Sequence, residues 1–314
     1  MQQYILRRLV QMVFVLVLFS IVVFTVLRLV PGDPVAAQLG LEATQEAYEQ
    51  LRAEMGLDQP IYIQYLRWLQ DISQGDFGTS WRSHQSALSL IQRRFPATIW
   101  LTVAAIVVGL AISIPLGIVA GVRPNSWMAH FSTLFSLVGI AMPSFWLGLM
   151  LLLTLAVSLR WLPPSGYISP LDDPILGSKY LFMPAFTLGV GLAAPLTRFI
   201  RSGMLDVMNT DYVRTARAKG LTESLVIFRH VIKNAMLSVV TIFGVLLGSL
   251  LGGSIITESV FNWPGIGTLL LQSIQQRDYG IVQGVVLFIS LIFMVVNLLV
   301  DLTYAYLDPR IRYQ

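Results

Sequence analysis

Residues 211–236, DYVRTARAKGLTESLVIFRHVIKNAM, are the part of the chain whose side chains are best suited to recognise another molecule. Lys and Arg side chains occur here between two long apolar stretches, in a pattern that predicts a helix, a break at Gly220 and a second helix. Asp211 lies where an acidic residue would cap the positive end of the first helix. Gly220 lies where a helix commonly ends in a left-handed residue. The chemistry that this pattern supports is docking of a protein partner, not bond making.

One face of the first predicted helix combines small side chains with flanking cations. Tyr212, Ala216 and Gly220 follow one another at intervals of four residues, so they share a face of the helix. Small residues on that face would admit close contact, and the cations beside it would orient a partner electrostatically. The predicted docking surface therefore consists of Asp211, Tyr212, Arg214, Ala216, Arg217, Lys219 and Gly220.

A second constellation is a run of glycines in the apolar segment that follows. Gly244, Gly248 and Gly252 are spaced by four residues within 237–257. Small residues at this spacing let helix backbones approach closely in lipid. The pattern predicts a packing seam, which either stays fixed or slides when the protein changes conformation.

The elements that position these residues are membrane spans. Of the 314 residues, 55% are hydrophobic and 12% are charged, about half the charged fraction of a soluble domain, which is roughly 25%. A transmembrane helix needs about 20 apolar residues, and six segments qualify. The predicted fold is therefore all-α and integral to the membrane, with spans at roughly 9–30, 98–120, 131–158, 180–198, 237–257 and 281–302. Pro143 is expected to kink the third span.

The distribution of charge orients these spans. With both termini in the cytoplasm, the inner segments carry twelve Lys and Arg against five Asp and Glu, and the outer loops carry eight against twelve. Basic residues accumulate on the cytoplasmic side of membrane proteins. We therefore predict one transmembrane domain over 1–314, an extracytoplasmic loop at 31–97 and a cytoplasmic loop at 201–236.

Several classes of function are disfavoured by what the sequence lacks. It has no cysteine, no glycine-rich motif that would cradle ATP phosphates, and three dispersed His that predict no metal site. There is no continuous basic stripe for nucleic acid. No span has an ionisable residue near its centre, which argues against a proton-driven carrier or a voltage sensor. Sodium coupling stays open through one candidate helix break, at Gly189–Gly191.

The 211–236 segment resembles the cytoplasmic coupling loop of permease subunits in the dipeptide and oligopeptide family of ABC importers. Further stretches resemble family signatures in the family's order, and together they cover the chain from Tyr4 to Tyr313. One departure is Ser238, where the family usually has proline. The additional matching stretches are RLVPGDPV at 28–35, ESVFNWPGIG at 258–267, QRDYG at 276–280 and NLLVDLTYAYLDPRIRY at 297–313.

The resemblance implies a type I ABC importer permease fold in the cytoplasmic membrane of a prokaryote. It also implies a second homologous permease subunit, two cytoplasmic ATPase subunits that bind ATP and Mg²⁺, and an extracytoplasmic substrate-binding protein. The chain itself would be no enzyme and would hold no cofactor. Relatives transport dipeptides, oligopeptides, glutathione or nickel complexes, and the sequence does not choose among these substrates.

Two other classes of function stay open from the residues alone. A secondary carrier or channel would transport substrate without a partner, and a membrane scaffold would only anchor a cytoplasmic protein. Transport by the isolated chain would indicate a carrier, whereas dependence on a copurifying ATPase would indicate an importer.

Overall fold

The computed structural model describes residues 2–29, 35, 39 and 44–307, and these residues are almost entirely helical. They form two compact units. The first contains residues 97–264 and the chain beyond 295, and the second contains residues up to 96 together with 265–294. Two long helices, α5 (Ala87–Val122) and α13 (Tyr279–Leu307), contribute residues to both units. Residues 30–34 of the matching stretch at 28–35 and residues 308–313 of the stretch at 297–313 lie outside the described residues.

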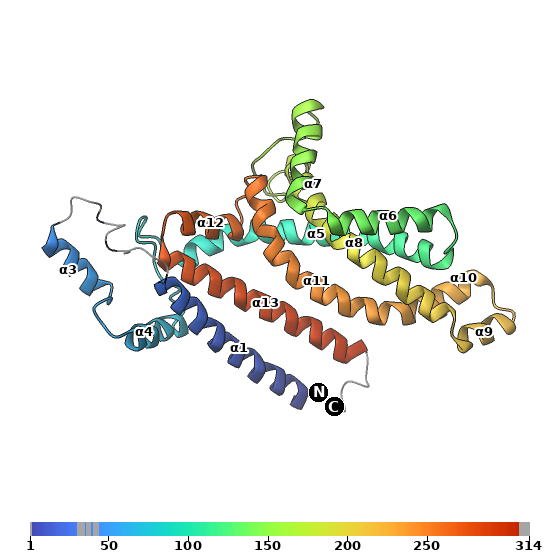
Figure 1. Cartoon of the computed structure of the whole chain (residues 1–314), viewed down its shortest axis with the longest axis horizontal. Helices are drawn as coiled ribbons and strands as arrows, with labels where there is room; N and C mark the ends of the chain where they lie inside the picture. Colours follow the sequence, from blue (N-terminus) through green and yellow to red (C-terminus); the bar gives the residue numbers. More distant parts are fainter. Residues whose placement is uncertain (1, 30–34, 36–38, 40–43, 308–314) are drawn as a thin grey trace. The chain divides into compact units, whose positions relative to one another are not determined.

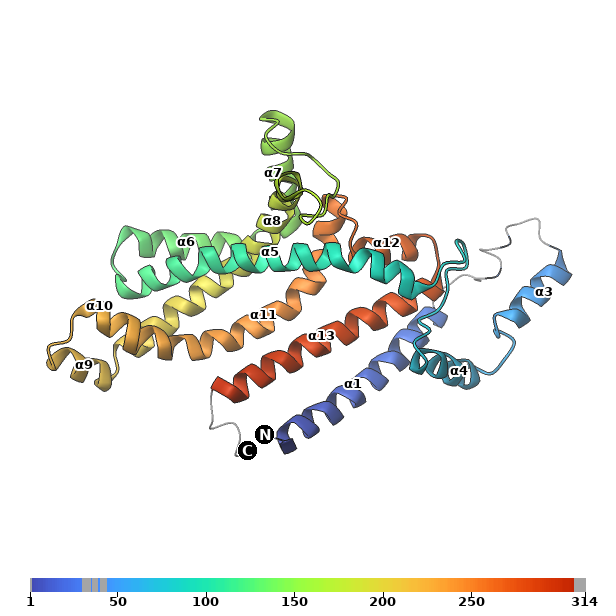
Figure 2. The same cartoon turned by 180° about the vertical axis from the view of Figure 1, so that it is seen from behind.

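The first unit is built around α8 (Pro174–Met208), which packs against α6 (Trp127–Ala141) and α11 (Ile232–Val260) (Figures 1 and 2). The chain between α6 and α8 forms α7 (Ser144–Leu151) and a π-helical turn (Leu152–Ser158). Most of the apolar window of α8 is buried inside the chain. It is therefore the central helix of this unit, although two prolines lie in its interior.

The helix α8 runs without a break through Pro184, Pro195 and the Gly189–Gly191 stretch. Asp173 caps its N-terminus: the Asp173 carboxylate accepts hydrogen bonds from the backbone N–H groups of Ile175 and Leu176 at 3.0 and 2.9 Å. Prolines are tolerated in such helices because neighbouring helices and side chains satisfy the freed backbone groups. The candidate helix break at Gly189–Gly191 is therefore not formed in this span.

Glycines bring α5 into close contact with α8. A Cβ atom added at Gly109 would lie 2.6 Å from the Leu192 side chain, and one added at Gly117 would lie 2.6 Å from Ile200. Further along α5, a Cβ at Gly121 would overlap Met204. Small residues thus create a helix seam here. Sequence reasoning missed this seam, although Gly117 and Gly121 have the four-residue spacing that is typical of one.

The third predicted span is bent sharply. The helices Trp127–Ala141 and Ser144–Ser158 meet at 103°, and Pro143 is the residue before the second helix. Proline cannot donate a backbone hydrogen bond and disfavours a helical conformation at the residue before it. The predicted kink is confirmed, and it is large enough to make this segment either a broken span or a re-entrant loop.

The second unit holds α1 (Gln2–Leu29), α3 (Gln45–Glu54), α4 (Ile61–Ser73) and α12 (Ile266–Gln275), besides its parts of α5 and α13. The helix α4 packs on α1, because Tyr65 and Trp68 lie 5.4 and 5.5 Å from the Phe24 ring. The Tyr65 hydroxyl is also hydrogen bonded to Ser20 at 2.8 Å. The α4 segment therefore packs on a span through these contacts.

Within the described part of the chain, four helices are long and apolar enough to cross a membrane, and the number rises to six if each of two bent pairs is one span. The six predicted segments all lie in these helices, so the predicted all-α membrane fold is confirmed. The predicted boundaries were too short, since α5 begins at Ala87, not at residue 98, and α8 begins at Pro174, not at residue 180.

Candidate coupling site

The predicted helix, break and helix at 211–236 are present at the end of the α8–α11 pair (Figure 1). The first helix is α9 (Asp211–Ala218), and the second is α10 (Glu223–Leu225), which continues through a π-helical turn (Val226–Val231) into α11. The capping residue of α9 is Thr210, not Asp211, which is the first residue of the helix. Asp211 instead contributes a negative charge in the first turn and forms an exposed ion pair with Arg214 at 3.3 Å.

Gly220 forms the turn between α9 and α10, and its φ is +77°. This confirms the predicted left-handed backbone conformation, which residues other than Gly and Asn rarely adopt. The residue is exposed, and a Cβ atom added there would meet nothing within 4 Å. The turn thus presents backbone directly at the surface.

The helices α9 and α10 and the turn between them form a helical hairpin. Ala216 lies on the inner side of this hairpin and not on its exposed face. Its side chain is only 6% exposed, and Val213 one turn earlier is completely buried. Both belong to a hydrophobic cluster with Ile200 and Met204 of α8 and with Val226 and Val231 of the second helix. The prediction of Ala216 as part of an exposed docking face is therefore wrong. Instead, Ala216 helps to fix α9 to α8 and to the π-helical turn before α11.

An ion pair closes the turn around Gly220. The guanidinium of Arg217 donates two hydrogen bonds to the Glu223 carboxylate, with N–O distances of 3.0 and 2.7 Å. The bond from Arg217 lowers the pKa of Glu223, and the same bond raises the pKa of Arg217. Because the Glu223 pKa is lowered on folding, its stabilising contribution is present at neutral pH and is lost as the pH falls through the folded pKa, below 4.5. Both groups are partly exposed, so the pair contributes at most about 1 kcal/mol.

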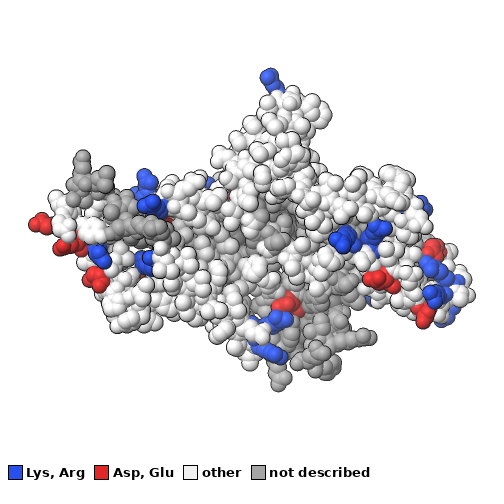
Figure 3. Space-filling view, viewed as in Figure 1, with Lys and Arg blue, Asp and Glu red and all other residues white. Residues whose placement is uncertain are grey.

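The remaining predicted residues lie on the surface of the hairpin. Tyr212 is 43% exposed, and its hydroxyl donates to the backbone carbonyl of His230 at 3.3 Å. Arg214 and Lys219 are exposed. Figure 3 shows Lys and Arg gathered with Asp and Glu over α9 and α10. The hairpin thus presents a mixed charged surface and a bare glycine turn while its apolar side is buried against the chain.

The three glycines of α11 have different surroundings. A Cβ at Gly244 would overlap the Val300 side chain of α13, whereas one at Gly252 would meet nothing within 4 Å. Gly244 and Gly248 are buried, and Gly252 is exposed. The three glycines were predicted to form one helix-packing seam, and within this chain they do not. Gly244 packs against α13, and Gly252 is open to lipid or to another subunit.

Gly244→Leu is expected to destabilise the chain, whereas Gly252→Leu is not. A leucine at Gly244 must displace Val300, and overpacking of this kind costs about 1–3 kcal/mol. The measurement is the thermal unfolding of each purified variant in detergent. Equal melting temperatures for Gly244→Leu and the wild type would contradict the close contact between α11 and α13. Reduced subunit association of Gly252→Leu at a normal melting temperature would place this glycine at an intersubunit contact.

One buried acidic residue of the first unit was missed by sequence reasoning. Glu258, in the last turn of α11, is completely buried and accepts a hydrogen bond from the Thr98 hydroxyl of α5 at 2.8 Å. Nearby, the indole N–H of buried Trp263 donates to the Ala97 carbonyl at 2.9 Å. The signal was present in the ESVFNW motif, but a glutamate at the edge of an apolar segment reads as a loop residue. It ties α11 to α5.

The described residues form a bundle of apolar helices from which a charged helical hairpin projects, and a buried cluster fixes this hairpin to two of those helices, as expected of an integral membrane protein. The chain belongs to the family described as "Binding-protein-dependent transport system inner membrane component", whose model matches residues 113–313. A model of the corresponding N-terminal region matches residues 1–102. The chain is therefore a permease subunit of an ABC importer in the inner membrane.

Curated relatives match the chain over its whole length. The glutathione transport system permease protein GsiC of Escherichia coli (strain K12) is 40% identical over 314 residues, covering 100% of both chains. The oligopeptide transport system permease protein AppB of Bacillus subtilis (strain 168) is 40% identical over 316 residues, again covering 100% of both.

A solved structure of the MetNI methionine ABC transporter in an inward-facing conformation shares the fold, with a TM-score of 0.55 at 18% identity. The match covers 70% of this chain and 96% of the MetNI chain. At this identity the likeness supports only the fold. It confirms the predicted type I importer architecture.

Proposed function

We propose that the chain forms half of the translocation pathway of an importer for short peptides, and that ATPase subunits drive it by pressing on the hairpin at 211–223. The observation that carries this proposal is the buried cluster that joins α9 to α8 and to the helix leading into α11. A force applied to α9 would reach two membrane helices through packed side chains, because close-packed interiors transmit strain.

The partners in this proposal are a second homologous permease, two cytoplasmic ATPases that hold ATP and Mg²⁺, and an extracytoplasmic binding protein. The family description names a binding-protein-dependent system, which supports the delivery of substrate by a separate protein. The names of the relatives support glutathione or oligopeptides as the substrate class. This chain would contribute the pathway and the docking hairpin, and the ATPase subunits would contribute hydrolysis.

Reconstitution in proteoliposomes tests this division of work. Uptake of glutathione or of a short peptide is expected only when the ATPase subunits, the second permease, the binding protein and ATP are all present. Uptake by this chain alone would indicate a carrier instead. Binding of the ATPase without uptake of any tested peptide, in the complete assembly, would favour a scaffold or another substrate class.

The proposed orientation places both termini and the hairpin in the cytoplasm and residues 31–97 outside, as the charge distribution predicts. Introduced cysteines report it cleanly because the natural sequence has none. Gln50→Cys and Gln85→Cys, both at exposed positions, are expected to react with an impermeant maleimide in intact cells. Lys219→Cys is expected to react only after permeabilisation. The reverse pattern would invert the topology.

A further inference from the structure

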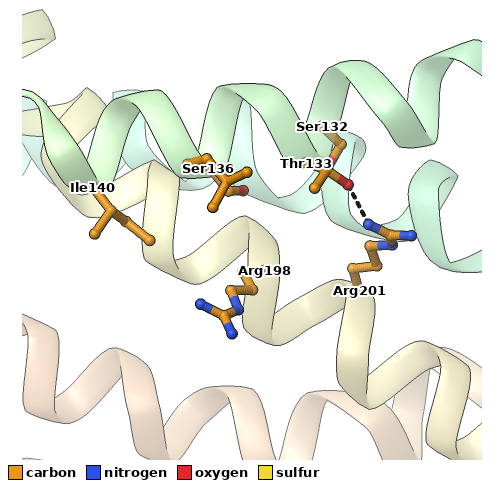
Figure 4. A pocket seen from close by; sticks show the side chains of 7 residues that line it. Ser132, Thr133, Ser136, Ile140, Arg198 and Arg201 are labelled. Carbon is orange, nitrogen blue, oxygen red and sulfur yellow. Dashed lines mark hydrogen bonds between the residues drawn. The ribbon is translucent and has the colours of Figure 1, made fainter.

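A cavity of about 240 Å³ in the first unit lies between α6 and α8, and its lining combines two guanidinium groups with three hydroxyl groups (Figure 4). The two arginines leave α8 one turn apart, and the hydroxyl groups come from α6. No carboxylate belongs to the lining, so the cavity is positively charged. The residues that line it are Ser132, Thr133, Ser136, Leu137, Ile140, Arg198 and Arg201.

The polar groups of the cavity are held in place but incompletely satisfied. Arg201 donates from one Nη to the Thr133 hydroxyl, which in turn donates to the Ala129 carbonyl at 2.8 Å. Among the described residues, the buried Nε of Arg201 and the buried hydroxyl of Ser136 have no hydrogen-bond partner. Ser136 is 4% exposed. Buried polar groups are nearly always paired, and an anion bound in this cavity would supply acceptors for both donors.

The polarity of the cavity changes along α6. Thr133, which contacts Arg201, lies closer to the start of the helix, and Leu137 and Ile140 lie further along it. These two apolar side chains are 57% and 52% exposed in the isolated chain. At the start of α6, Trp127 is 74% exposed, in a position typical of aromatic residues at the membrane interface. The cavity is therefore cationic towards the interface and apolar towards the membrane interior.

We propose that this cavity binds the phosphodiester of an anionic phospholipid, with the acyl chains along the Leu137 and Ile140 side of α6. The planar guanidinium of arginine can donate two hydrogen bonds to two oxygens of one phosphate, and basic pockets between transmembrane helices bind anionic headgroups. A free phosphate or the carboxylate of a peptide would use the same cations but would leave the adjoining apolar wall without a role. In the proposed orientation, the lipid comes from the cytoplasmic leaflet. Bound there, it bridges α6 and α8, the helix that leads into the coupling hairpin.

The test measures lipid binding to the complete, delipidated transporter in detergent by native mass spectrometry, which requires neither transport nor ATP hydrolysis. The probes are phosphatidylglycerol, phosphatidylcholine, inorganic phosphate and glutathione. Because the measurement does not depend on transport, a failure of the proposed transport function would not change the binding result. Arg198→Gln, Arg201→Gln and the double variant remove the cations of the cavity. Arg123→Gln is the matched control, because Arg123 is exposed beyond the end of α5 and does not line the cavity.

Wild-type protein is expected to retain phosphatidylglycerol in preference to phosphatidylcholine. Each single variant should weaken phosphatidylglycerol binding about fivefold and the double variant about 25-fold, from about 1 kcal/mol per basic residue at the membrane surface and tenfold per 1.4 kcal/mol. The Arg123→Gln control should bind as the wild type does. Arg198 is exposed, so Arg198→Gln should fold normally and tests the proposal even if Arg201→Gln impairs folding.

Three results would overturn the lipid assignment. Unchanged phosphatidylglycerol binding in Arg198→Gln and in the double variant would show that lipid binds elsewhere. Arginine-dependent binding of glutathione without binding of phosphatidylglycerol would assign the cavity to the transported substrate. Arginine-dependent binding of inorganic phosphate alone would indicate a site for a free anion.

Discussion

Replacing Gly220 by valine is expected to abolish substrate uptake while the chain still inserts into the membrane at normal abundance. Gly220 has a φ of +77°, and a β-branched residue in that region of backbone space is strained by about 1–3 kcal/mol. The turn between α9 and α10 would therefore open or reorient. The turn is exposed and distant in sequence from the membrane spans, so the loss would fall on docking of the ATPase. The measurement is uptake and substrate-stimulated ATP hydrolysis in proteoliposomes at matched permease content.

Gly220→Asn separates backbone strain from a steric effect at the docking surface. Asparagine tolerates the left-handed conformation better than other residues that carry a side chain, and the structure has open space where its Cβ would lie. If the turn conformation is what matters, the asparagine variant should retain most of the uptake. Loss of uptake in both variants would show that the partner packs directly on the glycine backbone. Wild-type coupling in Gly220→Val would contradict the assignment of the hairpin as the coupling element.

Arg214→Ala provides the milder comparison. Arg214 is exposed, and its pairing with Asp211 is a surface contact at 3.3 Å, which contributes little to stability. A charge at the rim of an interface mainly affects the rate of association and its dependence on salt. We therefore expect a partial loss of coupling relative to the wild type, and this difference should diminish at high ionic strength because salt screens the same charge in the wild type.

Val213→Asp is expected to detach α9 from the membrane helices and to uncouple ATP hydrolysis from uptake. Val213 is completely buried in the cluster with α8 and the second helix. An uncompensated charge buried there costs on the order of 3–5 kcal/mol, which is more than a short helical hairpin can absorb without opening. Backbone amide exchange of residues 209–222 is the direct readout, because local opening removes protection without global unfolding.

Thr215→Asp is the matched control for that variant. Thr215 lies on the exposed side of the same helix, so the same new charge is solvated and should leave amide protection unchanged. Fast exchange in Val213→Asp together with normal uptake would show that the buried cluster stabilises the hairpin but does not transmit force. Normal protection in Val213→Asp would contradict the packing itself.

The sequence alone determined the class of protein and the location of the helical hairpin that we propose as its coupling element. Long apolar segments leave few options but membrane helices, because backbone polar groups in lipid must be satisfied within the helix. The left-handed turn at Gly220 was also predictable, since a glycine after a short helix has a local conformational reason to be there. The kink near Pro143 was predictable as well, because proline restricts its own backbone and that of the residue before it. These features depend on residues that are adjacent in sequence.

Only the tertiary structure decided which faces of those helices are buried. Helical spacing placed Ala216 on a face with Gly220, but packing against α8 turned that side chain inward. The continuous α8 formed despite two internal prolines and the Gly189–Gly191 stretch because burial among neighbouring helices outweighs local propensity. The contact of Glu258 with Thr98 joins residues 160 positions apart, and no local pattern encodes such a pairing. Periodicity defines the faces of a helix, but the choice of the buried face depends on the shape and chemistry of elements far away in the chain.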